Sequence, residues 1–170
     1  QAFNEPEKIV YIPLFFQQDE CLDRREPKPF VLFHGDLSSW ENINAATFLI
    51  RSVASLDDSI DWVFAGLNPH PSLLRLAESH KNVSIKGNVE QEEMDSLLME
   101  AKVNILFTNQ KSGAKLKLLN VLRKGWFCLA TKEMVDGSQM EDLCVIIPRD
   151  PIRILSAIKE KLAAPFPLGE

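Results

Sequence analysis

The sequence contains no apolar run as long as the roughly 18 residues that a membrane-spanning helix needs. Cysteine is scarce: Cys21, Cys128 and Cys144 are the only three, and none belongs to a CxxC pair. The odd number, and the place of two of them in apolar runs, indicate buried thiols rather than a disulfide framework or a zinc site. Because such thiols fit a reducing compartment, we expect a cytoplasmic protein, either free or at the inner face of the membrane.

Several signatures of catalysis and nucleotide binding are also missing. There is no GxxxxGKS or GxxxxGKT phosphate loop and no GxGxxG dinucleotide fingerprint. Cys128 and Cys144 have no histidine signature nearby, and Ser112 has no adjacent base, which argues against nucleophilic catalysis. Positive charge is in deficit, with 19 Lys and Arg against 24 Asp and Glu, which argues against non-specific nucleic-acid binding.

What the sequence does contain is a regular alternation of two patterns. Its 45% hydrophobic and 25% charged residues are typical of one soluble globular domain. Six short apolar runs are continuous rather than alternating, as expected for parallel strands that are covered on both faces. The runs are FVLFH from Phe30, DWVFA from Asp61, VSIK from Val83, VNILF from Val103, WFCLA from Trp126 and LCVII from Leu143.

Helical spacing separates these runs. A serine cap at Ser38–Ser39 and the pair Asp150–Pro151 are typical helix starts. The predicted apolar faces are Ile43, Ala46, Thr47, Ile50 and Ala54; Met94, Leu97, Leu98 and Ala101; Leu118, Leu119 and Leu122; and Ile152, Leu155, Ile158 and Leu162. The alternation predicts a doubly wound α/β domain over residues 30–170, with a mostly parallel six-stranded sheet and helices on both faces. Residues 1–29 are interpreted as a linker or edge segment.

In the commonest strand order, a ligand binds beyond the ends of the first and fourth strands. The loops there are HGDLSS, residues 34–39, and TNQKSG, residues 108–113. A helix that starts near Ser112 or Gly113 leaves free backbone N–H groups, and these favour an anion. Lys111 and Lys115 are unfavourable at a helix N-terminus unless a phosphate neutralises them. This stretch therefore predicts a phosphate site.

The first of these loops offers further candidates, each with a plainer alternative. Gly35 either opens space under a phosphate or makes a turn. His34 either donates to a phosphate or sugar or packs in the core, and Asp36 either binds a sugar hydroxyl or caps the turn. Gly66, after the second strand, either lets a ligand approach or makes a turn.

Other polar and aromatic residues also allow two interpretations. Lys117 either contacts the phosphate or, like Lys124, lies on a solvated helix face. Trp40, Trp62 and Trp126 are expected in the core or between helix and sheet, with base stacking by Trp40 as an alternative.

In order and spacing, four segments resemble the carboxyl-terminal, donor-nucleotide half of retaining GT-B glycosyltransferases. The resemblance covers residues 30–147. The segments are FVLFHGDLSSWENINAA, DWVFAGLNP, KNVSIKGNVEQEEMDSLLMEAKVNILFT and SGAKLKLLNVLRKGWFCLAT.

This resemblance implies that a nucleoside-diphosphate sugar binds in the crevice, and that amides and lysines stabilise the departing diphosphate without a metal. An amino-terminal half would supply the acceptor site, so the fragment alone is expected to be inactive. The implied reaction is sugar transfer to a glycan or lipid-linked acceptor, as in surface-polysaccharide synthesis. The implied nucleotide-sugar-binding residues are Gly35, Ser112, Gly113, Lys115, Lys117 and Asn120, followed by His34, Asp36, Gly66 and Lys111.

The chain departs from the family pattern at four positions. Ser112 and Asn120 stand where many members have two glutamates, and Asp36 and Glu41 stand where they have diphosphate-binding cations. Lys115 or Lys117 could then supply the missing positive charge. The alternative is a catalytically degenerate domain that binds a sugar, a nucleotide or a protein partner.

Overall fold

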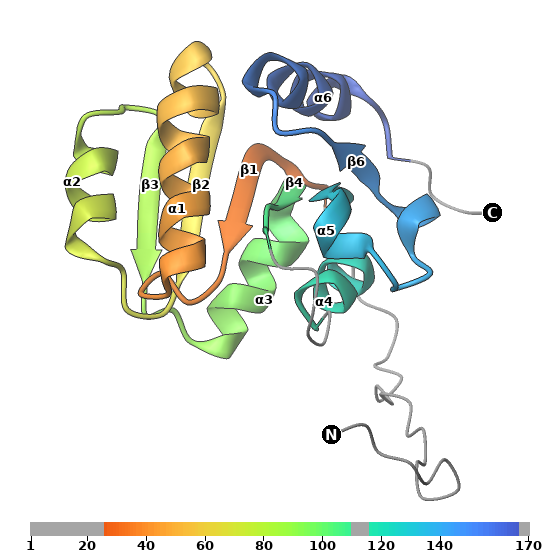
Figure 1. Ribbon diagram of the computed structural model, residues 1–170, viewed down its shortest axis with the longest axis horizontal. Helices are drawn as coiled ribbons and strands as arrows, with labels where there is room; N and C mark the ends of the chain where they lie inside the picture. Colours follow the sequence, from red (N-terminus) through yellow and green to blue (C-terminus); the bar gives the residue numbers. More distant parts are fainter. Residues whose placement is uncertain (1–25, 110–115, 167–170) are drawn as a thin grey trace, which may run out of the picture.

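The computed structural model describes residues 26–109 and 116–166, and in this part of the chain six strands form one parallel sheet (Figure 1). The strand order is β3-β2-β1-β4-β5-β6. The strands are β1 (Lys28–His34), β2 (Asp61–Gly66), β3 (Val83–Gly87), β4 (Ala101–Leu106), β5 (Phe127–Thr131) and β6 (Val145–Ile147). The predicted fold class is confirmed, and β1 lies next to β4, as the prediction of the crevice requires. The predicted linker or edge segment falls mostly on residues 1–25, which lie outside the described residues.

Helices cover both faces of this sheet, and each face has its own core. On one face, buried Phe33, Trp62 and Phe64 pack with the helices that follow β1, β2 and β6. On the other face, buried Leu32, Leu98 and Leu118 belong to a second cluster. The first face carries α1 (Trp40–Phe48), the π-helical turn η2 (Leu49–Val53), the 3-10 turn η3 (Ala54–Leu56), α2 (Pro71–Glu78) and α6 (Pro151–Ala163). The second carries α3 (Gln91–Glu100), α4 (Leu116–Lys124) and α5 (Lys132–Val135), and a short 3-10 turn η4 (Glu141–Leu143) precedes β6.

Side-chain caps explain where α1 and α6 begin. Ser39 caps α1 by accepting from the Asn42 amide, and Asp150 caps α6 by accepting from the Arg153 amide at 2.8 Å. Both starts were predicted from the sequence. Helix α2 was not predicted, although Pro71 at its first position is typical of a helix start.

Two predicted apolar positions are exposed. Ile152 is 72% exposed, because α6 contacts the sheet through Ile154 and Ile158 instead. Trp40 was expected in the core, yet it is 76% exposed, because it stands in the first turn of α1 beyond the end of the sheet. Trp62 is buried as predicted.

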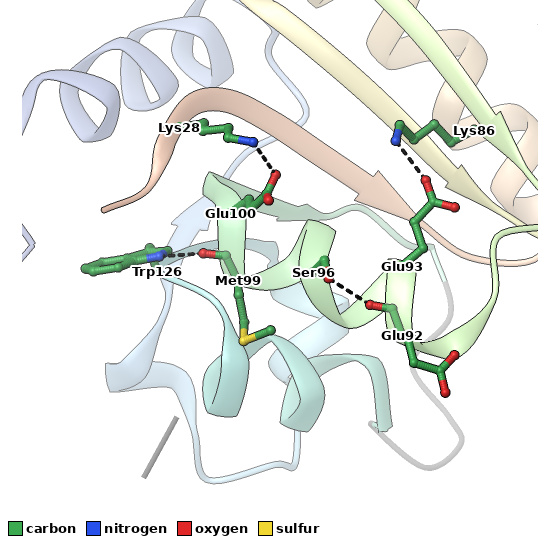
Figure 2. Close-up of polar contacts among 8 residues, drawn as sticks. All are labelled: Lys28, Lys86, Glu92, Glu93, Ser96, Met99, Glu100 and Trp126. Atoms are coloured by element: carbon green, nitrogen blue, oxygen red, sulfur yellow. Dashed lines mark hydrogen bonds and ion pairs between the residues drawn. The ribbon is translucent and has the colours of Figure 1, made fainter. Parts of the chain in front are cut away.

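Helix α3 is held by polar contacts to three separate strands or their ends (Figure 2). The exposed ion pairs contribute little stability on their own. The half-buried indole of Trp126, by contrast, fixes the end of α3 against the start of β5. The contacts are Lys28 Nζ to Glu100 at 2.8 Å, Lys86 Nζ to Glu93 at 2.8 Å, and Trp126 Nε1 to the Met99 carbonyl at 2.7 Å.

Candidate functional site

The candidate site lies where the chain turns to opposite faces of the sheet. β1 leads into α1 on one face, and neighbouring β4 precedes α4 on the other, so the carboxyl ends of these strands flank a topological switch point. Four predicted site residues, Lys111, Ser112, Gly113 and Lys115, lie outside the described residues. The predictions for them therefore stay predictions.

Gly66 lies against the backbone of Gly35 at this edge. The Gly35 amide donates to the Ala65 carbonyl at 3.0 Å. A Cβ at Gly66 would stand only 1.6 Å from the Gly35 carbonyl oxygen, and the φ of Gly66 is +154°. The close approach of the two strand ends therefore requires glycine at position 66.

Gly35 leaves room for a cation instead. A Cβ at Gly35 would stand 2.5 Å from Nζ of Lys117 and 2.9 Å from the Asn42 amide nitrogen. Lys117 comes from the first turn of α4, and its Nζ donates to Oδ1 of Asn42 at 3.1 Å. The absent side chain of Gly35 thus provides the space in which the Lys117 ammonium lies.

Lys117 is half-buried, so its interpretation as part of a solvated helix face is wrong. Burial lowers the pKa of Lys117, while the carboxylates of Glu41 and Asp36 act in the opposite direction. The same interpretation is wrong for Lys124, whose Nζ lies 2.6 Å from Asp95 and whose side chain is only 14% exposed. The two lysines are therefore held at opposite ends of α4.

Asp36 caps the turn after β1. Its Oδ1 accepts from the amide of Ser38 at 3.0 Å and from the Ser38 hydroxyl at 2.7 Å. These hydrogen bonds, more than the nearby Lys117, lower the pKa of Asp36. Of its two sequence interpretations, the contacts favour the turn cap.

His34 ends β1 as a buried, neutral side chain. It is 8% exposed, and burial, followed by the nearby Lys117 ammonium, lowers its pKa from 6.5 to about 4. Within the described part of the chain, its Nδ1 has no hydrogen-bond partner. An unpaired buried nitrogen costs about 1–3 kcal/mol, so a ligand group that reached it would recover this energy.

The segment after β4 is anchored from two directions. Oε1 of Glu41 accepts from the Thr108 hydroxyl and from the Asn109 amide, the latter at 3.1 Å. Arg149, which follows β6, donates to the Thr108 carbonyl at 2.8 Å. Sequence reasoning noted Glu41 only as a departure from the family pattern and missed Arg149, because both contacts join residues more than 40 positions apart.

Asn120 is a half-buried residue of α4. It lies three residues after Lys117, so the two side chains are neighbours on the helix surface. Lys117, Gly35 and Asp36 converge at the end of β1, and Asn120 lies further along α4. Among residues 26–109 and 116–166, no group of three or more His, Cys, Asp or Glu side chains is arranged to hold a metal ion.

Comparison with known proteins adds a fold relationship. No protein-family model matches the chain, and no curated protein matches it by sequence. Solved structures do match the chain in fold. A UDP-forming alpha,alpha-trehalose-phosphate synthase from Burkholderia xenovorans has a TM-score of 0.60 at 8% identity, over 81% of this chain and 37% of that one.

Of two further matches, one is a structure with bound sugar ligands and one is a glucosyltransferase domain. A mutant of TarM from S. aureus, in complex with fondaparinux, alpha-GlcNAc-glycerol and UDP, has a TM-score of 0.65 at 12% identity, over 88% of this chain and 31% of that one. The catalytic domain of cholesterol-alpha-glucosyltransferase from Helicobacter pylori has a TM-score of 0.53 at 16% identity, over 79% of this chain and 87% of that one.

The strand order defines a doubly wound α/β domain with a topological switch point between β1 and β4. Within that class, the chain has the fold of one Rossmann-like domain of GT-B glycosyltransferases. The resemblance predicted from the sequence is confirmed at the level of the fold. The chain spans about a third of the length of the first two matched structures, with 37% and 31% covered.

Proposed function

We propose that the chain is the donor-binding domain of a glycosyltransferase. The domain would bind a nucleoside-diphosphate sugar, and the complete enzyme would transfer the sugar to a glycan or lipid-linked acceptor. The observation that carries this proposal is the Lys117 ammonium lying over Gly35 at the β1–β4 switch point. One protein of the same fold, TarM, is seen in complex with UDP.

Lys117 would perform the task that cations after the first glycine perform in the family. Asp36 and Glu41, which follow β1, occupy the positions that such cations take in the family. The Lys117 ammonium reaches the same end of β1 from α4. A diphosphate in the crevice would gain a charge-assisted contact with this ammonium. Because the contact strengthens as charge develops on the leaving diphosphate, it would also stabilise the transition state, with no metal required.

A catalytically degenerate binding module is the second candidate function. It is favoured by the use of Glu41 to anchor Thr108 and Asn109, and of Asp36 to cap a turn. Both residues have structural contacts and bring negative charge close to the proposed diphosphate position. Such a module would still bind a nucleotide or sugar but would support no transfer.

The complete enzyme would need a second, acceptor-binding half, because the chain spans about a third of the first matched structures. We propose that this half supplies the acceptor site, and that the 170-residue chain alone performs no transfer. No helix in residues 26–109 and 116–166 is both long and apolar enough to cross a membrane. A cytoplasmic location remains part of the proposal.

Calorimetric titration with UDP-, GDP- and ADP-sugars tests the binding function. The proposal expects saturable binding of at least one of these donors, with a Kd in the millimolar range or lower. We further propose that Asn120 hydrogen-bonds a ribose hydroxyl, so Asn120→Ala should weaken binding of that donor. A folded chain that binds none of the three donors would contradict the proposal.

A further inference from the structure

Two cysteines lie together at the end of the sheet away from the proposed donor site. In the β5–β6 ladder, Leu129 pairs with Val145 in parallel register. Cys128 lies one residue before Leu129 on β5, and Cys144 immediately precedes β6 in extended backbone, so the two side chains share a face. Their Sγ atoms lie 3.7 Å apart.

The backbone spacing suits a covalent link between these sulfurs. Neighbouring strands lie about 4.8 Å apart, and disulfides join Cα atoms separated by about 4.4–6.8 Å. The sulfurs already touch, so only a small rotation of each side chain is required to bring them to bonding distance. Cys128 also belongs to the core cluster on the α3–α4 face, and Cys144 packs against that cluster.

A groove gives small molecules access to the pair. The groove has a volume of about 350 Å³ and is lined by both cysteines together with Trp126, Asp142 and Lys161. Cys144 is half-buried, whereas Cys128 is only 4% exposed. An oxidant entering the groove would therefore meet Cys144 first.

The two thiols also differ in acidity. The hydrogen-bonded contact with Cys128 lowers the pKa of Cys144, although burial and the nearby Glu141 act in the opposite direction. The same pairing, followed by burial, raises the pKa of Cys128. The thiolate is the nucleophile, so the more acidic Cys144 is the sulfur that attacks the oxidant. Cys128 is the sulfur that then attacks the oxidised Cys144.

We propose that Cys144 and Cys128 form a peroxide-reactive dithiol site. The Cys144 sulfur attacks one oxygen of a hydroperoxide and breaks the O–O bond, which yields Cys144 sulfenic acid and water or an alcohol. The Cys128 sulfur then attacks the Cys144 sulfur, and the displaced hydroxide takes the Cys128 proton and leaves as water. The two thiols lose two electrons and the peroxide gains them. A dithiol reductant then reduces the Cys128–Cys144 disulfide back to two thiols and is itself oxidised to a disulfide.

The test uses the whole chain with Cys21→Ser, which removes the third cysteine. The protein is treated with hydrogen peroxide and examined by intact mass, thiol titration and peptide mapping. We expect loss of two hydrogen masses and of both free thiols within one chain, with a peptide that links Cys128 to Cys144, and recovery of both thiols with dithiothreitol.

Two variants in the same background separate the roles of the thiols. In Cys128→Ala, a dimedone adduct should accumulate on Cys144, because no partner resolves the sulfenic acid. In Cys144→Ala, Cys128 should stay unreacted. The proposal is overturned if the Cys21→Ser protein keeps both thiols free, oxidises Cys144 to sulfinic acid without a link, or forms a disulfide only between two chains.

Discussion

Replacing Lys117 by methionine removes the ammonium at the proposed diphosphate position and keeps a side chain of similar length. A hydrogen bond to a charged group contributes about 1.5–3 kcal/mol net. Asp36 and Glu41 already neutralise part of this charge, so we expect the lower half of that range. The loss corresponds to a roughly 10- to 40-fold increase in Kd for a nucleoside diphosphate.

The assay is calorimetric titration with UDP, GDP or ADP, whichever the unmodified chain binds. Lys81→Met is the matched control, because Lys81 is an exposed lysine paired with Asp58 near the amino end of β3, away from the site. It also removes one positive charge from the chain. If Lys117→Met binds the nucleotide as tightly as Lys81→Met does, the assignment of Lys117 to the diphosphate is refuted.

Three further predictions concern the residues around Lys117. Gly66→Ala should lower the free energy of unfolding in urea by about 3 kcal/mol or more, because its Cβ would overlap the Gly35 carbonyl, and unchanged stability would contradict the close approach. His34 binds its proton more weakly when folded, so stability should fall by up to about 3 kcal/mol as pH decreases from 6.5 to 4. The urea unfolding midpoint of His34→Asn should lack that part of the pH dependence. If the midpoints of His34→Asn and the unmodified chain change with pH in the same way, the buried neutral histidine is contradicted. Glu41→Gln should speed hydrogen exchange at the Asn109 amide by roughly 5-fold, for a hydrogen bond weakened by about 1 kcal/mol, and equal exchange would disprove the anchor.

The fold could be predicted from local sequence, because the four central strands β1, β2, β4 and β5 are largely apolar and largely buried. The caps at Ser39 and Asp150 were also recognisable, since capping depends on residues within one turn. The exposed positions of Trp40 and Ile152 could not be predicted in this way. Trp40 lies in the first turn of α1, and Ile152 lies on the side of α6 away from the buried Ile154 and Ile158, so apolar spacing alone does not show which side contacts the sheet.

The candidate site was predicted in outline but not in its contacts. The expected strand order, with β1 beside β4, is observed, and Gly35 and Lys117 were both candidates. Their direct approach depends on how α4 is oriented against β1, and periodicity alone does not determine this orientation. The anchoring of Thr108 by Glu41 and Arg149 likewise joins distant segments and leaves no local signal.

The central claim is that a nucleoside diphosphate binds at the β1–β4 switch point, over Gly35 and against Lys117. A crystal structure of the chain with the bound nucleotide tests this most directly. The account predicts a phosphate oxygen within hydrogen-bond distance of Lys117 Nζ, close to the end of β1. A nucleotide bound elsewhere on the domain, with Lys117 still on Asn42 and the space above Gly35 unchanged, would contradict it.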